Sequence, residues 1–269
     1  MDIRRRLVIP TSAWLFHRGW RWAQRHGAIG PHTPNPYRFA SFGSGALLAF
    51  PPGCVYGEDK IAIGEQALIG ELVTLSVGYA PEQDLGPDVR LRIGARTSIG
   101  RGSHVVVHES VTIGDDVFVA PYVYITDQNH TYAEPDVPVG RQWPVNAPVV
   151  IGDGCWLGTG SIVLPGSRLG RNVTVAGGSV VRGVFPDHCV IGGVPARVLR
   201  SFTPGSGWHA PAPAPADAGP APAGAAPYDS RRQVAQDRRH GRARAPRRRG
   251  IRPLSPVKRP RVTDDTATP

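Results

Sequence analysis

An aliphatic residue recurs at every sixth position in the second half of the chain. The series consists of Ile151, Leu157, Val163, Leu169, Val175 and Val181. This period is neither the helical period of about 3.6 residues nor the simple alternation of an independent strand. A fixed repeat of this kind predicts a solenoid, in which short strands wind around one continuous core.

The same period runs through the first half of the chain, where glycine follows many of the aliphatic residues. The series consists of Ile63, Ile69 and Leu75, then Ile93, Ile99 and Val105, and, after a shift of two residues, Val107, Ile113, Val119 and Ile125. Three repeats predict a triangular coil of about 18 residues, whose aliphatic side chains point inward and whose strands pair in parallel with the next coil. We expect glycine to turn the corners because it tolerates a positive φ.

Two segments interrupt the repeat and are predicted to leave the coil as loops. They are residues 76–92, which contain two prolines, and residues 126–148. Long loops inside a compact solenoid are usually functional. The second loop contains a histidine, His130, near its start.

The two ends of the chain differ from the repeat region. Residues 1–50 are predicted to form an N-terminal cap region, in which a short helix over Thr11–His26 covers the open end of the solenoid core. The tryptophans and arginines of this helix leave an interfacial membrane anchor as the alternative. Residues 203–269 are rich in Pro, Ala and Arg and poor in apolar residues, so we expect a disordered tail.

The net charge of +10 belongs mostly to the tail. Residues 1–202 carry a net charge of +2, and residues 203–269 carry +8. The folded part is therefore not expected to bind nucleic acid. We interpret the tail as a solubilising extension, with a tether to nucleic acid or acidic membrane, or a weak contact with acidic partners, as the alternative.

Cysteine usage and hydropathy bear on the compartment. The three cysteines are odd in number and lack the spacing of metal ligands, which indicates neither a disulfide framework nor a zinc site. The apolar stretch near the N-terminus is broken before it reaches the length of a signal peptide or a spanning helix. We therefore expect a cytoplasmic protein.

Three segments carry a resemblance to a known family. They read VTIGDDVFVAPYVYITDQNH from Val111, VVIGDGCWLGTGSIVLPGSRLGRNVTVAGGSVVRGVFP from Val149, and GGVPARVLR from Gly192. The chain resembles the hexapeptide-repeat O-acetyltransferases, which include galactoside, maltose and surface-polysaccharide acetyltransferases. The resemblance implies an all-β fold, a left-handed parallel β-helix over residues 51–202, and a homotrimer whose sites are each shared by two chains.

The resemblance also implies that His130 is the general base. Transfer of an acyl group from a thioester to a hydroxyl requires a group that removes the hydroxyl proton, and imidazole titrates close to neutral pH. Asp127 or a backbone carbonyl could fix its tautomer. A solvated loop histidine without a role is the alternative. No Cys or Ser with a positioned base indicates a covalent intermediate, so direct transfer is expected.

Acetyl-CoA is the acyl donor that the resemblance implies. The positions that match cofactor contacts are Trp156, Thr159, Gly177, Arg182, Arg197 and Arg200. Backbone amides at small residues can bond the pantetheine amides, and arginines can pair with phosphate oxygens. A surface aromatic and ordinary solvated cations are the alternative interpretations of Trp156 and of the two C-terminal arginines.

The acceptor implied by the resemblance is a sugar or glycoside. Residues of the second loop are expected to line its side of the site, namely Tyr132, Arg141, Gln142 and Trp143. His104 and His108 depart from the galactoside enzymes, which carry Asn and Asp near the acceptor hydroxyls.

Two other functions stay open at this point. With His130, the histidines His104 and His108 allow a metalloenzyme like the γ-class carbonic anhydrases. Their spacing does not match that family's ligands, so no metal is expected. A non-catalytic β-helix scaffold that binds through the arginine-rich tail is the other alternative.

Overall fold

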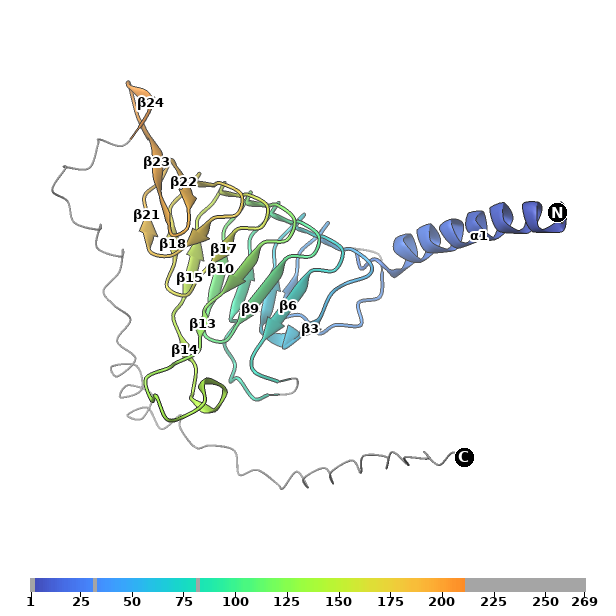
Figure 1. The fold of residues 1–269 in the computed structure, drawn as a ribbon, viewed down its shortest axis with the longest axis horizontal. Coiled ribbons are helices and arrows are strands. Elements are labelled where there is room, and N and C mark those ends of the chain that lie inside the picture. The colour runs from blue at the N-terminus through green and yellow to red at the C-terminus, as the bar shows by residue number, and fades with distance from the viewer. Residues whose placement is uncertain (1–2, 31–32, 81–82, 211–269) are drawn as a thin grey trace, which may run out of the picture. The chain divides into compact units, whose positions relative to one another are not determined.

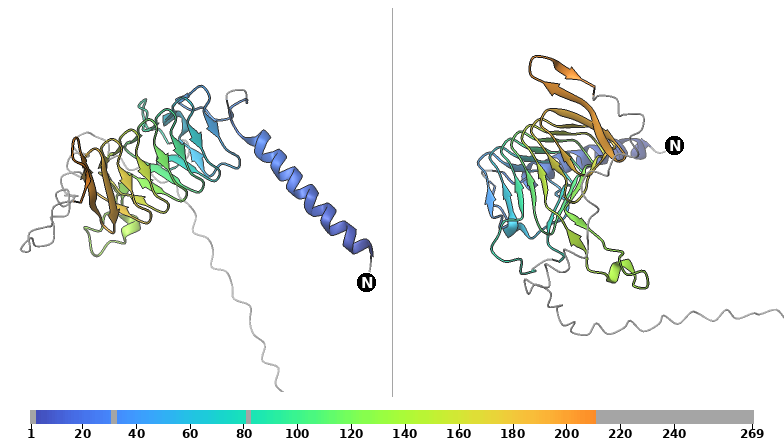
Figure 2. Two further views of the ribbon diagram at one scale, coloured as in Figure 1. Left: turned by 90° about the horizontal axis from the view of Figure 1, so that it is seen from above. Right: turned by 90° about the vertical axis from the view of Figure 1, so that its left-hand side faces the viewer.

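The computed structural model describes residues 3–30, 33–80 and 83–210, which form one helix followed by a parallel β-helix (Figure 1). The helix, α1, runs over Ile3–Gly27. Each coil of the β-helix contributes one strand to each of three faces, and Figure 2 shows the coils stacked one behind another.

The three faces are parallel sheets, which we call faces 1, 2 and 3 in the order in which the chain visits them. Face 1 contains β1 (Ser41–Phe42), β4 (Ile61–Ile63), β7 (Leu91–Ile93), β10 (Val111–Ile113), β15 (Val149–Ile151), β18 (Arg168–Leu169) and β21 (Val184–Phe185). Face 2 contains β2 (Leu47–Leu48), β5 (Leu68–Ile69), β8 (Ser98–Ile99), β11 (Phe118–Val119), β16 (Trp156–Leu157), β19 (Thr174–Val175) and β22 (Cys189–Gly193). Face 3 contains β3 (Val55–Tyr56), β6 (Thr74–Val77), β9 (His104–Val107), β12 (Tyr124–Thr126), β17 (Ile162–Val163) and β20 (Val180–Val181).

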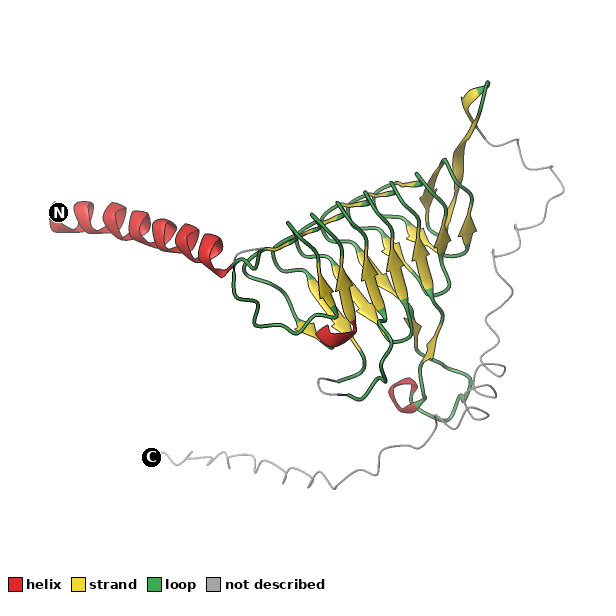
Figure 3. Ribbon diagram, turned by 180° about the vertical axis from the view of Figure 1, so that it is seen from behind, coloured by secondary structure: helices red, strands yellow, loops and turns green. Residues whose placement is uncertain are grey.

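The remaining elements lie outside the regular coils. Two antiparallel strands, β23 (Ala196–Thr203) and β24 (Gly207–His209), extend face 2 beyond the last coil. The second loop contains the antiparallel pair β13 (Gln128–Asn129) and β14 (Val145–Asn146) and the short helix η2 (Val139–Arg141). A second short helix, η1 (Glu58–Lys60), precedes β4. Figure 3 shows how much of the structure is turns rather than strands.

The aliphatic residues of the repeat stack inside the prism as predicted. On face 1 the register places Ile63, Ile93, Ile113, Ile151 and Leu169 in one column. On face 2 the column contains Ile69, Ile99, Val119, Leu157 and Val175, and on face 3 it contains Leu75, Val105, Ile125, Val163 and Val181. Each of these side chains is at most 3% exposed, so the six-residue period corresponds to core positions.

The glycines that follow the aliphatic residues have a different role from the predicted one. Gly64, Gly100 and Gly152 do not have a positive φ; the positive values occur further along the corner, for example at Gln66 (φ 54°) and Asp116 (φ 55°). A Cβ at Gly100 would lie 2.6 Å from the backbone nitrogen of Pro121 in the next coil. Glycine is therefore needed because successive coils approach closely, and not because of its backbone freedom.

The described strands extend beyond the predicted limits of the β-helix domain at both ends. Strand pairing begins at Ser41, before the predicted boundary at residue 51. At the other end, residues 203–209 belong to the β23–β24 hairpin rather than to a disordered tail. The rest of the predicted tail, from residue 211, lies outside the described residues.

Helix α1 is longer than predicted, and mainly its C-terminal end contacts the first coil. The rings of Trp20 and Phe50 are 6.4 Å apart, and Gln24 Nε2 donates a hydrogen bond of 2.9 Å to Glu71 Oε1. The core at this end is covered by the segment after the helix, where Ile29 is buried and Tyr37 and Phe39 pack against the core. The segment after the helix, rather than the helix itself, therefore caps the core within the predicted cap region.

We predict that Gly100→Ala lowers the free energy of unfolding by about 1–3 kcal/mol, because the new methyl group meets backbone atoms that cannot move independently. Gly140→Ala is the matched control, since a Cβ at Gly140 meets nothing within 4 Å. Urea denaturation of both variants measures the difference. Equal stability of the two would contradict the close approach of the coils.

Candidate active site

Both long loops leave the prism at the same corner, where the chain passes from face 3 to face 1 (Figures 1 and 3). One loop, residues 78–90, connects β6 to β7, and the other, residues 127–148, connects β12 to β15. Between them lies the short corner 108–110, which connects β9 to β10 and absorbs the two-residue shift of the repeat. This corner is the centre of the candidate site.

A buried carboxylate ties the second loop to that corner. Asp127 is 0% exposed, and its oxygens accept three backbone N–H bonds, from His108 at 2.9 Å and from Glu109 and Ser110 at 2.7 Å each. Hydrogen bonds to a charged acceptor are stronger than those between neutral groups. Asp127 therefore fixes the start of the loop against the preceding coil, and it is not the partner that orients His130.

Aromatic rings from the two loops meet above the corner. The ring of Tyr79, from the first loop, lies 4.3 Å from that of His108 and 5.6 Å from that of Trp143, from the second loop. Asn146 Nδ2 also donates a hydrogen bond of 3.3 Å to the Tyr79 hydroxyl. Tyr79 therefore joins segments that are far apart in the sequence.

Several buried polar atoms around Tyr79 have no hydrogen-bond partner among the described residues. They are Nδ1 of His108, Oδ1 of Asn146 and Nε of Arg90. The other nitrogens of Arg90 donate to the backbone oxygens of His108 and Leu85. Nδ1 of His108 lies 3.8 Å from Oδ1 of Asp127. All three atoms are enclosed by the loops and the corner and are not exposed to solvent.

The side chain of His130 is exposed and follows directly after β13. Within the described residues no hydrogen bond to its ring occurs, so the structure assigns it no orienting partner. The imidazole is accessible to a substrate.

The predicted acceptor residues lie in the same loop but differ in their surroundings. Tyr132 is 79% exposed, Trp143 is 66% exposed beside Tyr79, and Arg141 is exposed in η2. Gln142 is different, because its amide bonds the backbone of Glu134 and Val137. We therefore expect Gln142 to shape the loop rather than to contact an acceptor.

The predicted cofactor residues are distributed over several parts of the prism. Thr159 and Gly177 lie side by side in successive coils at the corner between faces 2 and 3, where the Gly178 N–H donates to the Thr159 oxygen at 2.9 Å. Trp156 is 49% exposed on face 2. Arg182 follows β20 at the corner that carries the loops, and Arg197 and Arg200 are exposed on β23.

Sequence reasoning missed Tyr79, Arg90 and Asn146. Each lies at an end of a segment that interrupts the repeat, so the two phase breaks were the available signal. The contact between the loops was not predictable from that signal, because it depends on which corner each loop leaves.

The buried cysteines are poor nucleophiles. Burial raises the pKa of the Cys155 thiol to about 11, and burial also raises the pKa of Cys189. A thiol is reactive as its thiolate, so these two residues do not suit covalent acyl transfer.

The histidines considered as metal ligands do not gather. His104 is exposed on β9, whereas His108 is 7% exposed at the corner. Over the part of the chain that the structure describes, no group of three His, Cys, Asp or Glu side chains could hold a metal ion.

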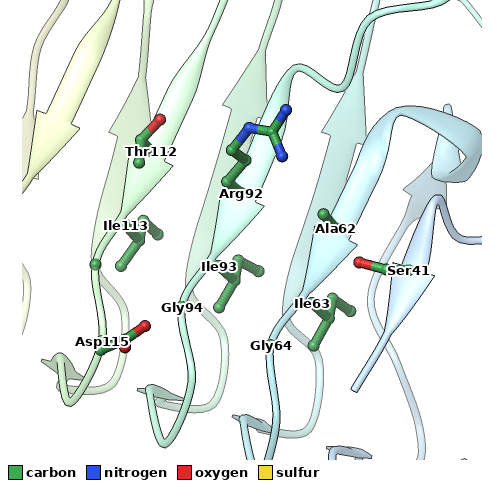
Figure 4. A pocket seen from close by; sticks show the side chains of 11 residues that line it. Ser41, Ala62, Ile63, Gly64, Arg92, Ile93, Gly94, Thr112, Ile113 and Asp115 are labelled. Atoms are coloured by element: carbon green, nitrogen blue, oxygen red, sulfur yellow. The ribbon is translucent and has the colours of Figure 1, made fainter.

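A shallow groove of about 310 Å³ crosses face 1 in the N-terminal half (Figure 4). Its lining includes the side chains of Arg92, Thr112 and Asp115. None of the predicted site residues lines this groove, so it is separate from the candidate active site.

Two family models match the repeat region. The model described as "Bacterial transferase hexapeptide (six repeats)" matches residues 148–183, and "Hexapeptide repeat of succinyl-transferase" matches residues 90–127. These two segments of the chain are therefore similar to hexapeptide repeats of bacterial transferases.

The curated relatives are acetyltransferases. The chain is 41% identical over 106 residues to the putative lipopolysaccharide biosynthesis O-acetyl transferase WbbJ of Escherichia coli, which covers 37% of this chain and 54% of the relative. It is 32% identical over 127 residues to the galactoside O-acetyltransferase of the same organism, covering 43% and 59%. The chain thus spans about half the length of these relatives. The predicted resemblance to hexapeptide-repeat O-acetyltransferases is confirmed.

Solved structures with a similar fold include two mutants of AntD, an N-acyltransferase from Bacillus cereus. One, in complex with dTDP-4-amino-4,6-dideoxyglucose and coenzyme A, has a TM-score of 0.51 at 20% identity and covers 61% of this chain and 84% of its own. The other, in complex with dTDP and coenzyme A, has a TM-score of 0.50 at 18% identity and covers 62% and 86%. The predicted left-handed parallel β-helix is confirmed.

We predict that Asp127→Ala lowers the free energy of unfolding by about 2–4 kcal/mol, because three backbone N–H groups lose their acceptor. Asp127→Asn keeps one acceptor oxygen and should lose less. Asp136→Ala, at an exposed position of the same loop, is the control. Urea denaturation of the three variants tests this, and wild-type stability of Asp127→Ala would show that the carboxylate does not hold the corner.

Proposed function

We propose that this protein transfers an acetyl group from acetyl-CoA to a hydroxyl of a sugar or glycoside-like acceptor, with His130 as the general base. The observation that carries the proposal is the accessible imidazole of His130 on a loop whose base is fixed to the coil by Asp127. The acetyltransferase names of the curated relatives support the reaction class.

In the proposed mechanism, His130 takes the proton from the acceptor hydroxyl as its oxygen attacks the thioester carbonyl. A C–O bond forms and the tetrahedral intermediate then collapses with cleavage of the C–S bond. The leaving thiolate of coenzyme A takes the proton from the imidazolium, which restores the base. A backbone N–H would stabilise the oxyanion.

The loop cluster supports a sugar as the acceptor. The exposed rings of Trp143 and Tyr132 offer surfaces on which a sugar ring can stack. We propose that the acceptor binds between the two loops, with Arg141 at the outer side.

The donor would lie along the corner that carries Thr159 and Gly177. A side chain is absent at Gly177, so the backbone there is open to the pantetheine amides. Trp156 lies on the adjoining face, and Arg197 and Arg200 lie towards the last coil, where they can pair with phosphates. Arg182 lies at the other corner and would reach the donor only from a neighbouring chain.

This arrangement favours a site shared by two chains. Within one chain, the loop of His130 and the Thr159–Gly177 corner lie at opposite edges of face 3. A homotrimer would bring the loop of one chain to the donor corner of the next. Exposed apolar side chains in register on face 2, namely Leu68, Phe118 and Trp156, support burial against a second copy.

We further propose a cytoplasmic location. The described cysteines are free, and two of them are buried, which fits a reducing compartment.

We predict that His130→Ala reduces acetyl transfer by about 10²–10⁴-fold, the usual contribution of a general base. Release of free thiol from acetyl-CoA in the presence of a panel of sugars measures the rate. His17→Ala, which removes an exposed histidine from α1, is the control and should keep wild-type activity. Full transfer by His130→Ala would show that another group is the base, and the absence of any transfer by the wild type would favour a scaffold.

A further inference from the structure

One face of α1 presents alternating tryptophan and arginine side chains. Trp14, Arg18, Trp22 and Arg25 are spaced by four, four and three residues, so they follow one face of the helix. The guanidinium of Arg18 lies 5.2 Å from the centre of the Trp14 ring. Trp14 is 53% exposed and Trp22 is 62% exposed, although large aromatic side chains gain most from burial.

The opposite side of the helix is the one that contacts the β-helix. Trp20 packs against Phe50, and a Cβ at Gly27 would lie 2.5 Å from the same ring. Because Trp20 contacts Phe50, the face that carries Trp14 and Trp22 points away from the β-helix at this contact.

All charged side chains of α1 at neutral pH are positive. The helix contains six arginines and no Asp or Glu, whereas residues 28–202 carry a net charge of −3. Aromatic residues combined with arginines are typical of helices that lie in the interface of an anionic bilayer. Among the described residues, no helix has the length and hydrophobicity needed to cross a bilayer.

We propose that α1 lies on the surface of a membrane that contains anionic phospholipid. Trp14 and Trp22 would enter the headgroup region, and Arg18 and Arg25 would pair with lipid phosphates. Leu15, which is 57% exposed, lies on the same side of the helix as Trp22 and adds apolar surface that acyl chains can cover.

Other occupants fit these observations less well. A second copy of α1 would bring like charges together, which is destabilising. A nucleic acid would neutralise the arginines and stack on the tryptophans, but it would leave Leu15 in water. The combination of charge and aliphatic surface therefore favours a lipid surface.

The test is sedimentation of the full-length protein with vesicles of phosphatidylcholine alone or mixed with phosphatidylglycerol. We expect binding to the mixed vesicles, reduced at least tenfold by the double variant Trp14→Ala/Trp22→Ala and also by Arg18→Gln/Arg25→Gln. The control is Phe202→Ala/Trp208→Ala, which removes two exposed aromatic rings from the C-terminal hairpin and should bind like the wild type.

Thermal unfolding of each variant checks that the β-helix is intact. The proposal is overturned if the wild type does not bind the mixed vesicles, or if the tryptophan variant binds them as well as the wild type does. It is also overturned if the variants weaken binding to single-stranded DNA while vesicle binding is unchanged. Acetyl transfer to soluble sugars is independent of these outcomes.

Discussion

The structure depends on how closely successive coils approach one another. Parallel pairing of strands stacks the aliphatic side chains into three columns, and at the corners the backbones come so close that a Cβ at Gly100 would meet Pro121. A coil of this kind cannot absorb extra residues on a face without breaking its column. Additional chain must therefore leave at a corner, and both long loops leave at the corner between faces 3 and 1.

This constraint explains how a loop with a reactive side chain can be attached to the rigid β-helix. The loop of His130 begins at Asp127, whose carboxylate is buried and bonded to the backbone of the preceding coil. The base of the loop is thereby fixed, while the imidazole of His130 stays accessible to substrate. The first loop contributes Tyr79, which contacts the second loop through Trp143 and completes the acceptor side of the proposed site.

Most of the fold could be predicted from the sequence because the repeat is local: each aliphatic residue reports its own position in the coil. The predicted role of the glycines is wrong. Gly64 and Gly152 are needed because the backbone of the neighbouring coil lies too close for a Cβ, and the sequence of a single repeat does not reveal that approach. The candidate site was predictable only in part. His130 follows from the resemblance, but Tyr79 and Asn146 become neighbours only through the stacking of coils, and the sequence carries no direct signal of that contact.

We propose that the active site forms between two chains, with His130 from one and the Thr159–Gly177 corner from the other. The most direct measurement is acetyl transfer by hybrid assemblies of two inactive variants, His130→Ala and Thr159→Trp, the second of which fills the donor corner. Co-refolded mixtures should regain activity, because some interfaces combine an intact histidine with an intact corner. Mixtures that stay as inactive as the separate variants would place both halves of the site in one chain and refute the shared site.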